Sequence, residues 1–200
     1  MRDSNQSRTR RRASRGRRGL ATLWLILVLP LMLIAACFAL ETANLWLARM
    51  ELEDALEAAA LAAVEEWGTT NNNFNARQKA VAFAAVNSVR GTPVTLADNY
   101  DVLNFPNNNL SMAQTASLVF GTVDTTYNFD AGLAPDATCV NPDAAYGVYA
   151  YAEVEVPMIC SNIFGCVFGP FTVKAKTLAR YDCTVASPCP TLVRMASFSP

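Results

Sequence analysis

The sequence contains no histidine, and its six cysteines include no Cys-x-x-Cys pair. The absence of histidine excludes a Ser-His-Asp triad, a Cys-His dyad and every zinc site that needs an imidazole ligand. The missing Cys-x-x-Cys pairs argue against thioredoxin-like and zinc-ribbon proteins. The glycine-rich patterns GxxxxGK[ST] and GxGxxG, which bind nucleotide phosphates, are absent too. We therefore predict no enzymatic activity, no catalytic or metal-binding residues, no cofactor and no small-molecule substrate.

Charge is scarce and unevenly distributed. Only 16% of the 200 residues are charged, whereas 52% are apolar, which is enough to build a core. Residues 1–18 carry eight arginines and one aspartate, a net charge of +7, and the remaining residues carry a net charge of −8. The overall net charge of −1 therefore describes neither part of the chain.

A run of 21 uncharged residues extends from residue 20 to residue 40. As a helix it would be about 31 Å long, which matches the hydrocarbon core of a bilayer. Arginines precede this run and an acidic segment follows it, so the positive-inside rule places the N-terminus in the cytoplasm and residues 41–200 outside. The arginines adjoin the span without interleaved aromatic residues. We therefore assign them to topology and lipid headgroups and expect no nucleic-acid binding.

An alanine-rich helical face follows the apolar run. From Leu45 the apolar residues recur at offsets of three, four and seven, which is the spacing of one helix face. We predict one continuous helix over residues 20–67 and a second helix over residues 75–89. Alanines at contact positions let a neighbouring helix approach closely. That neighbour is either the protein's own second helix or a copy of the same or a related subunit. The candidate contact residues are Ala55, Ala59 and Ala63.

From Pro93 onward the composition favours strands. Residues 146–156 and 171–181 alternate between apolar and polar side chains, which predicts an antiparallel pair in which Lys174 and Lys176 face Glu155 and Glu153. Shorter strands are expected at residues 94–96 and 117–122. The predicted fold class is therefore α+β, in which a transmembrane helix continues into an alanine-rich helix, followed by a second helix and a small antiparallel sheet.

These patterns divide the chain into five segments. They are a basic cytoplasmic head (1–19), a transmembrane helix (20–40), an alanine-rich helical region (41–91), an exported strand-rich domain (92–182) and an irregular tail (183–200).

Five cysteines lie outside the span, and an exported domain permits disulfides. Cys160 and Cys166 lie in the connection between the two long strands, so we predict a disulfide between them. A second disulfide is expected within the group Cys139, Cys183 and Cys189, which leaves one thiol over.

The N-terminal part resembles TadG-like and TadE-like proteins of tight-adherence (Flp) pilus systems. The residues that carry the resemblance are the basic stretch ending in Arg17, Arg18 and Gly19, the span LILVLP, the acidic Glu41, and the helix LARMELEDALEAAALAA. The segments FGTVDTTYNFD and YGVYAYAEVEVP and the strand FTVKAKTLARY are also similar to the strand-rich tail of that group. Trp24 stands where TadE-like pseudopilins carry glutamate, which favours the TadG-like side. The resemblance implies a protein of the bacterial inner membrane with a periplasmic domain, whose Glu41 either meets a neighbouring cation or marks the water interface.

Three fates of the N-terminus follow from the sequence. Prepilin-type processing would cut between Gly19 and Leu20. Lipoprotein processing would use the loose lipobox Ile34-Ala35-Ala36-Cys37 and attach lipid to Cys37. Without cleavage the span stays as a fixed anchor, which we favour because the apolar run continues past Cys37 to Leu40.

The resemblance implies a membrane-anchored structural or assembly subunit, comparable to a minor pseudopilin, of a Flp/Tad-type pilus or a related secretion apparatus. Its partners would be the membrane and other subunits of that system, contacted through the N-terminal helix. Two alternatives are an exported lipoprotein and a membrane-anchored adhesive or ligand-binding domain without a pilus role.

Overall fold

The structure, a computed structural model, describes residues 6–110, 117–138, 140–160, 170–182 and 189–193. Side chains are described from residue 21 onward, apart from that of Cys189. The chain forms two compact units, residues 1–44 with 158–168, and residues 45–157 with 169–200. A long N-terminal apolar helix, a second helix and antiparallel sheets follow in that order, which confirms the predicted α+β class.

Two helices begin the chain. Helix α1 (Gln6–Thr70) runs without a break through the apolar run and the alanine-rich face, and helix α2 spans Asn73–Val86. Asn71, with a φ of 54°, reverses the chain between them, and the Asn72 side chain accepts the Asn75 N–H at 3.1 Å, which caps α2. The expected helix end near residue 67 is therefore three residues early. The second helix ends before the predicted residue 89, because β1 begins at residue 88.

The main sheet has five antiparallel strands in the order β4-β3-β5-β6-β7. Their bounds are β3 Leu118–Val123, β4 Phe129–Asp130, β5 Ala145–Val156, β6 Phe171–Asp182 and β7 Cys189–Val193. A short 3-10 helix, η1 (Pro142–Ala144), precedes β5, and β1 (Ser88–Val89) pairs with β2 (Thr92–Pro93).

Two strand predictions need correction. Residues 94–96 form no strand, because the short β1–β2 hairpin turns around Gly91 and its second strand already ends at Pro93. The tail after residue 182, expected to be irregular, contains β7 at the edge of the sheet. Pro190 lacks a backbone N–H, but a proline is tolerated in an edge strand such as β7.

The register between β5 and β6 differs from the predicted one by two residues. Lys174 lies opposite Glu153, with Nζ 2.6 Å from Oε1, and Lys176 lies opposite Tyr151. A shift of two residues keeps every side chain on its own face of the sheet. The alternation in the sequence therefore identified the faces correctly but could not choose between the two registers.

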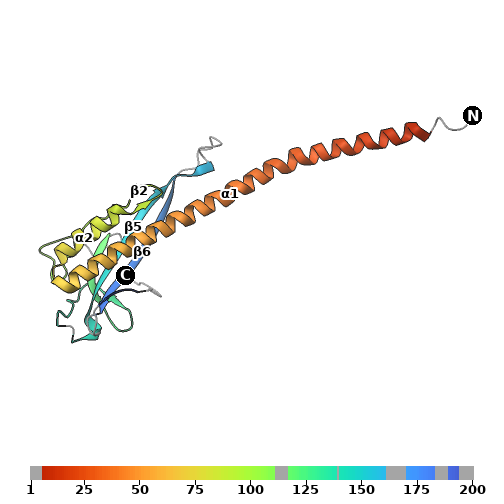
Figure 1. Cartoon of the computed structure of the whole chain (residues 1–200). Coiled ribbons are helices and arrows are strands. Elements are labelled where there is room, and N and C mark those ends of the chain that lie inside the picture. Colours follow the sequence, from red (N-terminus) through yellow and green to blue (C-terminus); the bar gives the residue numbers. More distant parts are fainter. Residues whose placement is uncertain (1–5, 111–116, 139, 161–169, 183–188, 194–200) are drawn as a thin grey trace, which may run out of the picture. The chain divides into compact units, whose positions relative to one another are not determined.

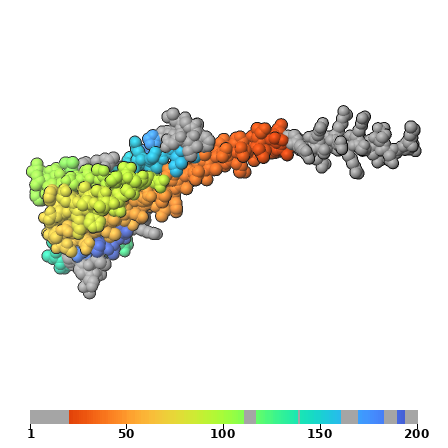
Figure 2. Space-filling model, turned by 45° about the horizontal axis from the view of Figure 1, so that its top comes forward, coloured from red at the N-terminus to blue at the C-terminus, as the bar shows by residue number. Residues whose placement is uncertain are grey.

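The core lies between the helices and one face of the sheet. In Figure 1, α2 and the orange part of α1 lie side by side against β5 and β6, and Figure 2 shows the two helices forming one continuous surface. Small side chains on both layers let the helices approach the sheet closely. The buried alanines of this core include Ala55, Ala59 and Ala63 of α1, Ala76, Ala80 and Ala84 of α2, and Ala150, Ala152, Ala175 and Ala179 of the sheet.

The backbone of α1 comes very close to the side chain of Tyr181 at Gly68, inside the last turns of the helix. A Cβ atom on this residue would overlap the ring of Tyr181. That ring is itself buried and packs edge-on against Tyr146, with ring centroids 6.4 Å apart. Gly68 is therefore required by packing, although glycine is a poor helix former.

We predict that Gly68→Ala destabilises the protein by about 1–3 kcal/mol, because overpacking outweighs the gain in helix propensity. In a Tyr181→Ala background the same change should instead stabilise by about 0.5–1 kcal/mol, as glycine-to-alanine changes in helices usually do. Urea unfolding of the full chain in detergent measures both. A stabilising effect in the presence of Tyr181 would contradict the packing argument.

A second constraint is the guanidinium of Arg77, which is fully buried beneath α2. Nη1 donates to the carbonyl oxygen of Asp98 at 2.6 Å, and Nη2 donates to the carbonyl oxygen of Asn107 at 3.0 Å and to Oδ1 of Asn109 at 2.8 Å. Its Cζ also lies 4.2 Å from the centre of the Phe120 ring. Oxygen atoms and an aromatic face thus replace the water that the cation loses.

We predict that Arg77→Leu lowers the free energy of unfolding by on the order of 3 kcal/mol or more, because it leaves several buried oxygens without donors. The matched control is Arg49→Leu. The side chain of Arg49 is 63% exposed and pairs with Glu53 on the same helix at 2.8 Å. Loss of that pair should cost at most about 0.5 kcal/mol. Equal losses in urea unfolding would show that burial of Arg77 is not what stabilises this region.

Candidate functional site

The first candidate site is the apolar part of α1. Among the residues that the structure describes, α1 is the one helix long and apolar enough to cross a membrane, over Ala21–Thr70. None of the most apolar stretch is buried within the chain. Large apolar side chains such as Leu25, Ile26 and Leu33 are at least half exposed. A helix that is apolar on all sides and uncovered by its own chain fits membrane anchoring.

Glu41 lies directly after this span and is only 8% exposed. One carboxylate oxygen, Oε1, accepts the backbone N–H of Cys160, and the other, Oε2, has no hydrogen-bond partner among the described residues. Glu41 therefore does more than mark the water interface, because it binds a segment that is distant in the sequence. Whether Oε2 also meets a cation of a neighbouring subunit stays a prediction.

Cys37 lies one helical turn before Glu41 and carries a half-buried free thiol, as does Cys160. The two thiols share a hydrogen bond. That hydrogen bond, together with burial and the nearby Glu41 carboxylate, raises the pKa of Cys160 to about 11. The Cys160 thiol is therefore protonated at neutral pH.

The predicted processing residues lie inside α1. The backbone is helical at Gly19 and Leu20, whose side chains are not described, and it is helical at the lipobox Ile34-Ala35-Ala36-Cys37. Helical backbone at both places neither requires nor excludes cleavage, so the fate of the N-terminus stays a prediction.

The three contact alanines of α1 are used within the chain. Ala55, Ala59 and Ala63 are each 0% exposed and belong to the core with α2 and the sheet. Of the two neighbours left open by the sequence, the structure places the protein's own elements on this face. Packing within the chain therefore explains the alanine pattern on which the resemblance rests.

The remaining cysteine predictions are not tested. Cys139, Cys166 and Cys183 lie outside the described residues, and so does the side chain of Cys189. The pairing of Cys160 with Cys166, and the pairing within the group Cys139, Cys183 and Cys189, therefore stay predictions. Among the described residues, no three cysteine or acidic side chains gather in a way that could hold a metal ion.

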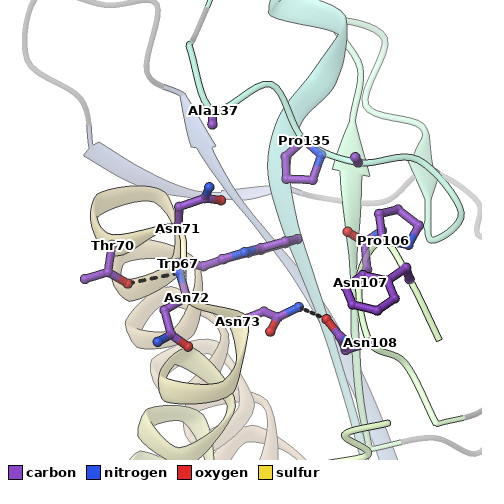
Figure 3. Close-up of a pocket in the computed structure, with 12 residues that line it drawn as sticks. Trp67, Thr70, Asn71, Asn72, Asn73, Pro106, Asn107, Asn108, Pro135 and Ala137 are labelled. Carbon is purple, nitrogen blue, oxygen red and sulfur yellow. Dashed lines mark hydrogen bonds between the residues drawn. The ribbon is translucent and has the colours of Figure 1, made fainter. Parts of the chain in front are cut away.

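A cavity of about 510 Å³ lies beside the turn between α1 and α2 (Figure 3). Its lining has no charged side chain. In Figure 3 the ring of Trp67 extends between the turn and the loops opposite, and a dashed line marks the hydrogen bond from Asn73 Nδ2 to Asn108 Oδ1, 2.8 Å long. The lining residues are Trp67, Thr70, Asn71, Asn72, Asn73, Phe105, Pro106, Asn107, Asn108, Ala134, Pro135 and Ala137.

Most amides of this cavity are already engaged. Asn107 is 2% exposed, and its Nδ2 donates to the carbonyl oxygens of Ala131 and Leu133 at 2.9 and 2.7 Å. Its Oδ1 has no hydrogen-bond partner among the described residues. The cavity could thus accommodate a neutral polar molecule. No local pattern in the sequence indicates this cavity, because its asparagines come from two segments, directly after residue 70 and near residue 107, that meet only in the fold.

The fold is α+β, and its first helix combines an apolar stretch that fits membrane anchoring with a stretch that belongs to the core. The model of the family described as "Putative Flp pilus-assembly TadE/G-like" matches residues 19–70. Residues 19–70 are therefore similar to this family, which confirms the resemblance predicted from the sequence. Neither a curated protein nor a solved structure matches the chain.

Proposed function

We propose that the protein is a structural or assembly subunit, comparable to a minor pseudopilin, of a Flp/Tad-type pilus or a related secretion apparatus. The observation that carries the proposal is the family match, which covers the anchor and the alanine-rich helix and ends at Thr70, where α1 itself ends. The function is structural: the anchor holds the protein beside other membrane helices, and the strand-rich body is displayed in the periplasm.

Lateral contacts with other subunits would involve apolar side chains that the core leaves uncovered. Because the alanine face is occupied by the protein's own elements, only the span and the first helical turns after it remain available on α1 for contacts with other subunits. Trp46 is 66% exposed there, with Leu47 and Met50 exposed beside it on α1. Tryptophan is enriched at membrane–water interfaces, which suits this position just after the span.

The charge asymmetry supports a bacterial inner-membrane protein with its N-terminus in the cytoplasm. The apolar run that continues past Cys37 to Leu40 supports an uncleaved span. We predict that protease added to intact spheroplasts digests the chain beyond about residue 45 and leaves an N-terminal fragment protected. A cytoplasmic protein that stays uncut is the control for membrane integrity. Complete protection of the body would contradict the orientation.

The protected fragment also reports the mature N-terminus. Retention of residues 1–19 supports a fixed anchor. A start at Leu20 would instead show prepilin-type processing, and a start at a lipid-modified Cys37 would show a lipoprotein.

A role in pilus assembly predicts that piliation depends on the exposed residues after the span. Trp46→Lys should remove most surface pili without lowering the amount of protein, because the charge disrupts apolar contacts in or near the membrane interface. The matched control is Val86→Lys on α2, where Val86 is 81% exposed and lies well beyond the span in sequence. Piliation is counted by electron microscopy. Unchanged piliation in a strain lacking the whole gene would overturn the pilus role.

The cavity beside the α1–α2 turn favours one alternative, a membrane-anchored adhesive or ligand-binding domain. Its support is the uncharged lining and the unpartnered Oδ1 of Asn107 among the described residues. Normal pili together with reduced surface attachment in the deletion strain would favour this second function.

A further inference from the structure

Two thiols and a carboxylate lie together near the end of the apolar span. Cys37 and Glu41 are four residues apart and therefore share one face of α1. Cys160, which follows β5 in the sequence, donates its backbone N–H to Glu41 and shares a hydrogen bond with the thiol of Cys37. All three residues belong to the same compact unit.

We propose that Cys37 and Cys160 form an intramolecular disulfide, which links the connection after β5 covalently to the anchor helix. The proposal rests on the exported orientation proposed above, because disulfides persist in oxidising compartments.

Three observations support this pairing. Glu41 holds the backbone of Cys160, and Cys37 lies one helical turn before Glu41, so the two thiols are neighbours. The hydrogen bond from the Cys160 N–H to Glu41 fixes the backbone of Cys160 against the helix. The connection, residues 157–170, contains no charged residue, so it can lie against the end of an apolar span without burying a charge.

The reaction needs an oxidant, and the natural one is the disulfide of an exported thiol oxidase. A thiolate of the protein attacks that disulfide, which breaks and leaves a mixed disulfide. The second thiolate then attacks the protein sulfur of the mixed disulfide and releases the oxidase as a dithiol. The protein loses two protons and two electrons, and the oxidase gains two electrons and two protons as its disulfide becomes the dithiol.

Glu41 is the positioning residue for this reaction. Its carboxylate accepts the Cys160 N–H and also contacts the Cys160 thiol, which is protonated at neutral pH. Glu41→Leu removes the acceptor of the Cys160 N–H and should therefore slow formation of the disulfide, whereas Glu41→Gln can still accept that N–H and should form the disulfide as the natural sequence does.

The proposal excludes two other fates of the same residues. If Cys160 bonds Cys37, it cannot bond Cys166, and a bonded Cys37 cannot carry lipid. Identifying the partner of Cys160 and the modification of Cys37 therefore distinguishes the proposed disulfide from a Cys160–Cys166 disulfide and from a lipid on Cys37.

The first test uses the full chain purified in detergent and oxidised with glutathione disulfide, which makes it independent of membrane orientation. Remaining thiols are blocked with N-ethylmaleimide, and unreduced peptides are analysed by mass spectrometry. We expect a peptide pair that joins Cys37 to Cys160 in the natural sequence and in the control Cys166→Ser. The pair should disappear in Cys37→Ser, in Cys160→Ser and after reduction. In the natural sequence, a bond from Cys160 to Cys166, or blocked thiols at both Cys37 and Cys160, would overturn the proposal.

The second test maps the same peptides from cells quenched with acid. We expect the Cys37–Cys160 pair there as well. If it forms in detergent but both thiols are free in cells, the protease experiment separates the causes. A body that is digested outside would refute the disulfide itself. A body that is protected would refute the exported orientation and, with it, the disulfide in cells. A lipid-modified Cys37 would also overturn the proposal.

Discussion

The buried guanidinium of Arg77 is the constraint on which the folded body, formed by α2, the loops and the sheet, most depends. A cation without water needs oxygen atoms around it, and these come from residues 98, 107 and 109, which are far from α2 in the sequence. Desolvation lowers the pKa of Arg77 to about 10, partly offset by the nearby Asp98, so the group remains charged at pH 7. Because each of these oxygens must reach the same guanidinium, the side chain of Arg77 holds α2, the loop from 98 to 109 and the start of β3 together.

The loop held by Arg77 in turn completes the sheet. Asn109 accepts the N–H of Phe120 at 2.9 Å and donates to its carbonyl oxygen at 2.8 Å, while Asn99 accepts the N–H of Leu118 at 3.0 Å. Two side-chain amides thus take the place of a neighbouring strand along the part of β3 that β4 does not cover. An uncovered edge would offer these groups to another chain, so the asparagines also protect β3 from unwanted pairing.

The sequence was informative where a local pattern decides the structure. Helical spacing predicted the long α1, and alternation predicted β5 and β6, because each pattern reflects a face that must be buried. It failed where the deciding partner is distant. The predicted helix ends at residue 67, just before Gly68, whereas the structure keeps Gly68 inside the helix, where the ring of Tyr181 leaves no room for a side chain. The burial of Arg77, the cavity at Asn107 and the contact between Cys37 and Cys160 depend on residues more than twenty positions apart, and no local pattern records such contacts.

The dual use of α1 limits how the protein can meet its partners. Its C-terminal half presents alanines to the protein's own core, because only small side chains allow the close approach of helices and sheet. Those alanines are therefore not available to another subunit while the body is folded. The most apolar stretch of its N-terminal half is not buried by the described residues, which fits a helix that is covered by lipid or by other membrane helices. The same helix thus divides at about Glu41 into a part that packs in the protein's own core and an apolar part whose surface is left for contacts with other helices.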